Sequence, residues 1–240
     1  MATAELRENL DRFSVAVLTA APGVIPTFIG TGFCVQLAKR TYFITAAHVI
    51  DSIIDGLFLG KRAIKTFASN GFITRRESEQ LDLAVLPITD EQMSEIGIEP
   101  ILEAQIDKVG VYRDGFHCLM GYPVSKNKLG GAVRMNEGLI NSVCYGINTE
   151  RTPVDYGAYG KTEQLHIAVK YDTAVSDGGR VYQPPSLRGV SGAPLWITKD
   201  KLDYSKVLLG GFLIEYHRKG KVAFCTNMEH AVGFIRARYA

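Results

Sequence analysis

A histidine, an aspartate and a serine, each in a distinctive local sequence, are the residues of this chain best suited to do chemistry. His48 ends the run FITAAH, Asp82 begins the run DLAVL, and Ser191 lies within GVSGAP. A serine hydroxyl is a weak nucleophile at neutral pH, and it needs an imidazole to accept its proton and a carboxylate to fix the imidazole's tautomer. The three residue types therefore predict acyl-transfer chemistry, with peptide hydrolysis as the expected reaction.

Glycines flank the candidate nucleophile. Gly189 and Gly192 permit a tight turn around Ser191, in which the N–H groups of Gly189 and Ser191 can converge on a developing oxyanion. A nucleophile elbow of the α/β-hydrolase kind would need glycine where Ala193 stands. Structural roles remain open for each residue: a core histidine for His48, a strand or loop cap for Asp82, and a turn serine for Ser191.

Short apolar runs separated by turn residues predict an all-β protein that must position these side chains. The polar, acidic stretch 89–100 reads as a linker, which divides the chain into halves 1–98 and 99–240. Short helices are expected at 3–12 and 228–238. The expected strands are 14–18, 27–37, 40–45, 57–59, 64–67, 83–86, 110–112, 116–120, 133–136, 138–145, 165–169, 194–197, 207–215 and 222–226.

Composition and charge exclude several classes of protein. The chain has 240 residues, 46% of them hydrophobic and 22% charged, with a formal net charge of +2 that gives no sign of nucleic-acid binding. The acidic residues Glu5, Glu8 and Asp11 are atypical of a signal peptide. The sequence contains no run of 18 apolar residues, so it predicts no membrane span. We expect a cytoplasmic protein with neither nucleic acid nor membrane as a partner.

The cysteines and the remaining histidines give no sign of a metal site. The four cysteines are far apart and form no C-x-x-C pair, so buried free thiols are the favoured interpretation, with two disulfides as the alternative. His117, His166 and His230 have no second ligand at metal-binding spacing. Neither a metal nor another cofactor is therefore expected.

The motifs and their order resemble those of the trypsin-like (chymotrypsin-fold) serine proteases, in the bacterial and intracellular branch. The resemblance rests on TGF at 31–33, TAAH before and including His48, DLAV from Asp82, GYP at 121–123 and GVSGAP around Ser191. It implies two six-stranded antiparallel β-barrels, with His48 and Asp82 in the first half and Ser191 in the second. It also implies that Ser191 is the nucleophile, His48 the general base and Asp82 its orienting group, while Gly189 and Ser191 form the oxyanion hole.

Two departures from the digestive members of that family limit what the resemblance implies. Val190 stands where many secreted members carry an aspartate that pairs with a new N-terminus, so activation by N-terminal insertion is not expected. No aspartate stands at the base of the primary pocket, which excludes an evident preference for Arg or Lys. The residues expected to bind substrate are Pro185, Arg188, Leu213, Glu215 and His217, of which Glu215 could attract a basic residue and Arg188 or His217 an acidic one.

The family resemblance leaves more than one function open. The favoured one is a serine endopeptidase that acts on a protein or peptide through an acyl-enzyme. One alternative is an effector protease of a bacterial signalling or defence system that a protein partner activates. Two others are a non-catalytic binding module on the same fold and an esterase or acyl transferase with the same three residues.

Overall fold

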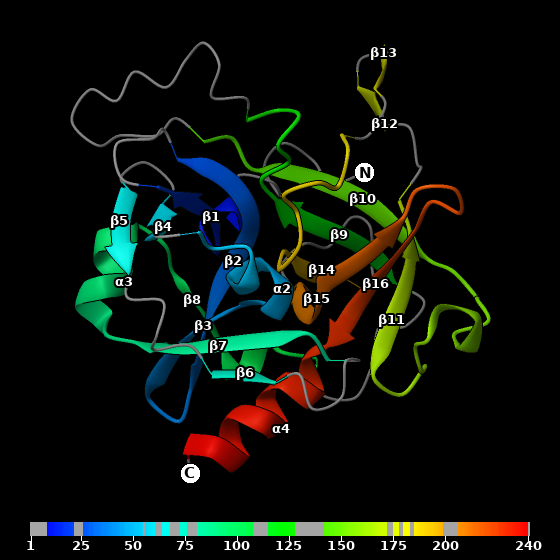
Figure 1. Ribbon diagram of the computed structural model, residues 1–240. Helices are drawn as coiled ribbons and strands as arrows, with labels where there is room; N and C mark the ends of the chain where they lie inside the picture. Colours follow the sequence, from blue (N-terminus) through cyan, green and yellow to red (C-terminus); the bar gives the residue numbers. More distant parts are fainter. Residues whose placement is uncertain are drawn as a thin grey trace.

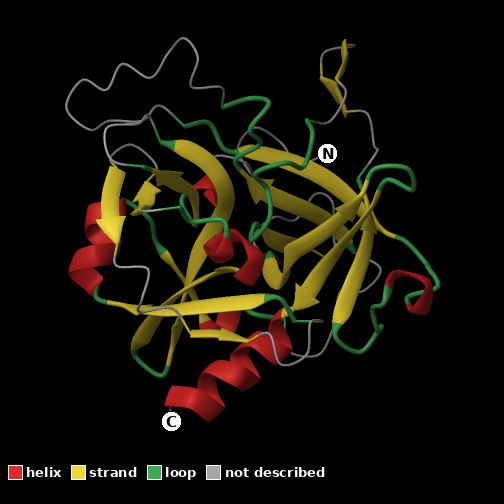
Figure 2. Cartoon of the chain, viewed as in Figure 1, coloured by secondary structure: helices red, strands yellow, loops and turns green. Residues whose placement is uncertain are grey.

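The computed structural model describes residues 9–21, 26–54, 56–60, 64–67, 73–75, 81–107, 115–127, 142–171, 175–177, 180–182, 185–198 and 206–239. Two β-sheets lie side by side and form most of the molecule (Figure 1). Strands dominate the structure and the helices between them are short (Figure 2). The fold is therefore mostly β, as the alternation of short apolar runs and turns predicts.

The first sheet contains strands from the first 102 residues. Its strand order is β5-β4-β1-β2-β3-β7-β6, and β8 pairs with β2 in parallel at a position off this path. Among the described residues this sheet has eight strands and curls into a half-barrel, where the family resemblance implies six strands. The strands are β1 (Ser14–Ala20), β2 (Thr27–Leu37), β3 (Arg40–Ala46), β4 (Gly56–Gly60), β5 (Ile64–Phe67), β6 (Ile73–Arg75), β7 (Leu83–Ile88) and β8 (Pro100–Leu102).

The second sheet closes into a six-stranded barrel in the order β10-β11-β16-β15-β14-β9. All its described pairings are antiparallel, so the predicted all-β fold with two barrel-like halves is confirmed. Its strands are β9 (Phe116–Gly121), β10 (Tyr145–Arg151), β11 (His166–Lys170), β14 (Pro194–Thr198), β15 (Leu208–His217) and β16 (Val222–Asn227). A separate hairpin consists of β12 (Val175–Asp177) and β13 (Arg180–Tyr182).

The stretch predicted as a linker contains a helix, α3 (Asp90–Ile96). Thr89 and Gln92 form a reciprocal capping box at its start, and Gly97 ends it in the left-handed conformation with φ +77°. These contacts satisfy backbone groups at both helix ends, so the polar composition reflects an exposed helix instead of an irregular linker. The division between residues 98 and 99 stays a prediction; β8, which follows it, pairs with β2 of the first sheet.

Most of the expected strands coincide with observed ones, and the run expected at 138–145, whose residues 138–141 lie outside the described residues, is wrong at 142–144. Residues 142–144 of the run expected at 138–145 are outside any strand, and β10 begins at Tyr145 and continues through a polar segment to Arg151. Pairing with β9 and β11 decides this strand, because its own sequence has few apolar residues to signal it. The runs at 110–112 and 133–136 lie outside the described residues, as does most of the helix expected at 3–12.

A shared core and a C-terminal helix join the two sheets. The rings of Phe33 in the first sheet and Phe212 in the second have centroids 6.2 Å apart. Helix α4 (Met228–Tyr239) follows β16, and its end reaches the first sheet, where the Arg40 guanidinium donates to the Tyr239 carbonyl at 3.1 Å. The Tyr42 and Tyr239 rings also pack with centroids 5.2 Å apart. Within the described ranges no helix is long and apolar enough to cross a membrane.

Candidate active site

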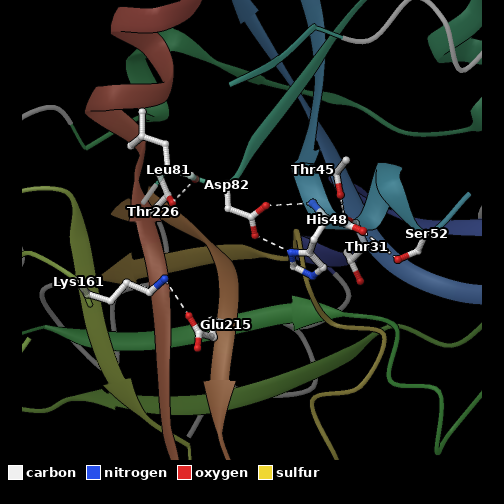
Figure 3. A network of polar contacts seen from close by, with 9 residues as sticks. All are labelled: Thr31, Thr45, His48, Ser52, Leu81, Asp82, Lys161, Glu215 and Thr226. Atoms are coloured by element: carbon white, nitrogen blue, oxygen red, sulfur yellow. Dashed lines mark hydrogen bonds and ion pairs between the residues drawn. The ribbon is translucent and has the colours of Figure 1, made fainter. Parts of the chain in front are cut away.

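The pairing of β3 with β7 brings His48 and Asp82 together. Ala46 at the end of β3 pairs with Leu83 at the start of β7, so the residues that follow Ala46 and precede Leu83 become neighbours. His48 lies in the short helix α2 (Ala47–Asp51). Its Nδ1 is 2.5 Å from one carboxylate oxygen of Asp82, and its backbone N–H donates to the other oxygen at 2.9 Å (Figure 3). This geometry holds the imidazole with Nε2 free of that carboxylate, as an orienting role for Asp82 requires.

Asp82 has a backbone conformation that side chains rarely adopt, with φ +44°. A left-handed residue of this kind costs about 1–2 kcal/mol, so its neighbours must hold it in place. The Asp82 carbonyl accepts a hydrogen bond from Ala47 N–H at 2.8 Å. On the other side, the buried Thr226 hydroxyl of β16 donates to the Leu81 carbonyl at 2.7 Å (Figure 3). The second barrel therefore helps to fix the aspartate of the first.

Ser191 lies in a tight loop that leads into β14. Gly189 and Gly192 both have φ +85°, which explains the need for glycine on either side. The Ser191 carbonyl accepts from Thr31 N–H at 2.8 Å, and Gly192 N–H donates to the Leu213 carbonyl at 2.6 Å. The loop is thus anchored to β2 on one side and to β15 on the other.

Two backbone N–H groups of this loop have no acceptor among the described residues. Val190 N–H donates to Leu187 and Ala193 N–H to Val190, each at 2.9 Å. In the part of the chain that is described, the N–H groups of Gly189 and Ser191 have no such partner. These are the two groups that the sequence predicts as an oxyanion hole, and they are available to an external acceptor.

One open pocket contains all three candidate catalytic residues. His48, Asp82 and Ser191 line it together with Lys161, Ile214, Glu215 and Tyr216. The His48 side chain is 47% exposed and that of Asp82 19%, so the imidazole is accessible while the carboxylate is largely covered. Among the described residues no hydrogen bond joins the Ser191 hydroxyl to His48. A contact of this type often tightens only when substrate binds.

A network of charged side chains lies beside the three candidate catalytic residues. One oxygen of Glu215 on β15 accepts from Lys161 at 2.8 Å (Figure 3). Its other oxygen lies 2.9 Å from His217 Nε2. The Lys161 side chain is only 10% exposed. Lys161 follows a short 3-10 turn, η3 (Gly157–Tyr159), far from the motifs, and no sequence signal separates it from an ordinary loop lysine.

The other predicted substrate-binding residues have different surroundings. Pro185 is partly buried and Arg188 is exposed, both on the segment that leads to Ser191. Leu213 is fully buried in the core of the second barrel beside Val190, so its side chain does not line the pocket. Its backbone instead supports Gly192 and Ala193, whose carbonyl accepts Leu213 N–H at 2.9 Å.

Burial excludes three of the cysteines as rival nucleophiles, and position relative to the pocket excludes the fourth, the partly buried Cys144. All four are free thiols, and Cys34, Cys118 and Cys225 are buried. Burial raises the pKa of the Cys34 and Cys225 thiols well above the usual value, because an apolar interior disfavours the thiolate. None of the four lines the pocket around Ser191.

Similarity to known proteins is found only at the level of structure. No family model matches the chain, and no curated protein matches its sequence. The serine protease domain of the Sesbania mosaic virus polyprotein superposes with a TM-score of 0.53 and 15% identity, covering 95% of this chain and 91% of that one.

Two further solved structures are also similar. One concerns the coupled folding and binding of the Sesbania mosaic virus VPg protein (TM-score 0.50, 16% identity, 95% of this chain and 89% of that one). The other is a serine-to-alanine mutant of Rv3671c from M. tuberculosis in an inactive form (TM-score 0.49, 15% identity, covering 94% of this chain and 86% of that one). At 15% identity the likeness to the viral protease domain shows the fold alone, which is the chymotrypsin-like double barrel.

Proposed function

We propose that this chymotrypsin-like chain is a serine endopeptidase that cleaves peptide bonds through Ser191, His48 and Asp82. The observation that carries the proposal is the 2.5 Å contact between His48 Nδ1 and Asp82, in a pocket that Ser191 also lines. A histidine tied to a carboxylate next to a serine is the arrangement that activates a hydroxyl nucleophile.

The proposed reaction has two acyl-transfer steps. The Ser191 oxygen attacks the substrate carbonyl carbon while His48 Nε2 accepts the hydroxyl proton, and Asp82 stabilises the imidazolium that forms. The C–N bond then breaks as His48 gives that proton to the leaving amine, which leaves an ester on Ser191. Water, deprotonated by His48, attacks the ester and releases the acid with the serine hydroxyl restored.

The Gly189 and Ser191 amides complete the proposed mechanism as an oxyanion hole. Their N–H groups have no acceptor in the described part of the protein, so they can bind the negative oxygen of the tetrahedral intermediate. Removal of one such donor in serine proteases costs about 2.7–4 kcal/mol in the transition state. Each of the two N–H groups is therefore expected to contribute about 10²- to 10³-fold to the proposed rate.

Substrate is proposed to lie along the end of β15. Glu215 and Tyr216 line the pocket there, and His217 contacts Glu215 at the same end of the strand. Pro185 and Arg188, just before the catalytic loop, are proposed to form the opposite wall. Because Glu215 is already paired with Lys161, a charged substrate residue has to compete with or bridge this pair instead of meeting an isolated carboxylate.

Active-site labelling tests the proposal directly. A fluorophosphonate probe should label the wild-type protein, and labelling should disappear in Ser191→Ala and fall sharply in His48→Ala. Ser186→Ala, an exposed serine five residues upstream, is the matched control and should label normally. A wild-type protein that neither labels nor cleaves any member of a peptide library would contradict the proposal.

A protein partner and a cytoplasmic location stay predictions. One of the similar structures concerns the folding and binding of VPg, which makes protein partners of this fold worth testing. Cleavage of a peptide library with and without co-purified cellular protein separates a self-sufficient protease from a partner-activated effector. Parallel assays on ester substrates separate a peptidase from an esterase, and cell fractionation tests the location.

A further inference from the structure

Thr31 on β2 makes four hydrogen bonds around the catalytic loop. Its N–H donates to the Ser191 carbonyl at 2.8 Å, and its hydroxyl donates to the Gly189 carbonyl at 3.0 Å. The same hydroxyl accepts from Tyr122 N–H at 3.1 Å, and its carbonyl accepts from the Thr45 hydroxyl at 2.7 Å. Thr31 is fully buried, so these bonds form without competition from water.

The carbonyls on both sides of Gly189 are held away from the pocket. Thr31 binds the Gly189 carbonyl, and Val124 N–H donates to the Arg188 carbonyl at 2.9 Å. Because a trans peptide is planar, the Gly189 N–H points opposite to the Arg188 carbonyl. Fixing that carbonyl on Val124 therefore fixes the direction of the N–H that the proposed oxyanion hole uses. The Thr31 hydroxyl ties the 122–124 segment to the loop, because it accepts from Tyr122 N–H and donates to the Gly189 carbonyl.

The surroundings of Thr31 leave the loop little room to rearrange. A Cβ on Gly121 would lie 3.0 Å from the Thr31 hydroxyl and 2.8 Å from Val190, and one on Gly189 would lie 2.9 Å from the Tyr122 carbonyl. Val190 is fully buried in the apolar cluster below the loop. The loop is thus wedged between the 121–124 segment and β2, with no charged group needed beneath it.

We propose that Thr31 is a positioning residue that keeps the catalytic loop in its oxyanion-binding form, so the loop is ready without cleavage of the chain or an ordering ligand. This inference rests on the proposed function. It assigns to a hydroxyl from the first sheet the task of ordering the second sheet's catalytic loop. Regulation of such an enzyme acts on access to the pocket and not on the order of this loop.

The test removes the hydroxyl and keeps the shape. Thr31→Val loses both hydrogen bonds of the hydroxyl, and Thr31→Ser keeps them. Thr149→Val is the matched control. Thr149 is a fully buried strand threonine whose hydroxyl has no partner among the described residues. Two quantities are measured: kcat and KM on a peptide substrate, and amide hydrogen exchange at Val190 and Ala193. The exchange measurement reports the order of the loop whether or not the protein has activity.

The two measurements give distinct outcomes. We expect kcat of Thr31→Val to fall by about 10- to 100-fold with KM little changed, and exchange at Val190 to quicken, while Thr31→Ser and Thr149→Val resemble wild type. Unchanged exchange and unchanged kcat in Thr31→Val would overturn the inference. Faster exchange in a protein whose wild type is inactive would support the positioning role and refute the protease. If Thr31→Val does not fold, Thr31→Ala removes the same hydroxyl without filling its space.

Discussion

Replacing Gly192 with alanine should abolish active-site labelling because of a steric clash. The same replacement at another left-handed glycine separates this clash from the cost of the backbone conformation. Gly192 follows the proposed nucleophile and has φ +85°. A Cβ there would lie 2.1 Å from the Thr31 carbonyl oxygen and 2.3 Å from the Thr45 hydroxyl. Neither oxygen can move far. The Thr31 carbonyl belongs to β2, and the Thr45 hydroxyl is held by its hydrogen bond to that carbonyl.

Gly97, at the end of α3, provides the matched control. It has a similar backbone conformation, φ +77°, but a Cβ added there meets nothing within 4 Å. Both alanine variants pay about 1–2 kcal/mol for the left-handed conformation. Only Gly192→Ala adds the cost of overpacking, about 1–3 kcal/mol, so we expect losses in unfolding free energy of about 1–2 and about 2–5 kcal/mol.

Urea unfolding and fluorophosphonate labelling measure the two effects. Gly97→Ala should label at the wild-type rate, because α3 is not part of the pocket. Gly192→Ala should lose labelling even under conditions where it is folded, since relief of the clash must move either Ser191 or β2. Equal destabilisation of the two variants, or normal labelling of Gly192→Ala, would refute the reasoning.

Three further predictions follow from the buried contacts and the charged network. Thr226→Val leaves the buried Leu81 carbonyl, next to the proposed catalytic aspartate, without its hydrogen-bond donor. Urea unfolding should then report a loss of about 1–3 kcal/mol in unfolding free energy, and kcat should fall. Thr226→Ser keeps the hydroxyl and should restore both values. Cys34 and Cys225 should resist iodoacetamide in the folded protein at neutral pH, because burial raises the pKa of both thiols and blocks access; mass spectrometry should find them alkylated only after unfolding, and rapid native labelling would contradict their burial. Glu215→Gln removes the charge paired with Lys161, and a substrate-library profile should change its preference for charged residues while fluorophosphonate labelling is retained; an unchanged profile would exclude Glu215 from substrate recognition.

The parts of the fold that sequence reasoning predicts well depend on local signals. Short apolar runs broken by turn residues predict β2 and β5 with the observed bounds, and the helical spacing after residue 227 predicts α4. The neighbouring positions of His48 and Asp82 also follow from such runs. One run ends just before His48 and another starts just after Asp82, so the two residues become neighbours when these strands pair, as β3 and β7 do.

The parts that sequence reasoning misses depend on tertiary contacts or on short signals. The capping pattern of Thr89 and Gln92 is present in the sequence, but the seven-residue helix it begins is too short for a clear periodicity. Lys161 reaches the pocket because the segment between β10 and β11 brings it to Glu215 on β15. Thr31 reads as a strand threonine, and its hydrogen bonds to Gly189 and Tyr122 join residues that lie 158 and 91 positions away.

The links between the two sheets bear on the order in which the molecule assembles. The Tyr239 end of α4 contacts Arg40 across 199 residues, and Thr226 reaches Leu81 across 145. Contacts between such distant residues bear a large loop-closure cost and are expected to form late in folding. His48 and Asp82 meet through the pairing of β3 with β7, and Ser191 joins them only when the second sheet has docked on the first. In the proposed protease, a partly folded chain whose sheets have not docked holds Ser191 apart from His48 and stays inactive.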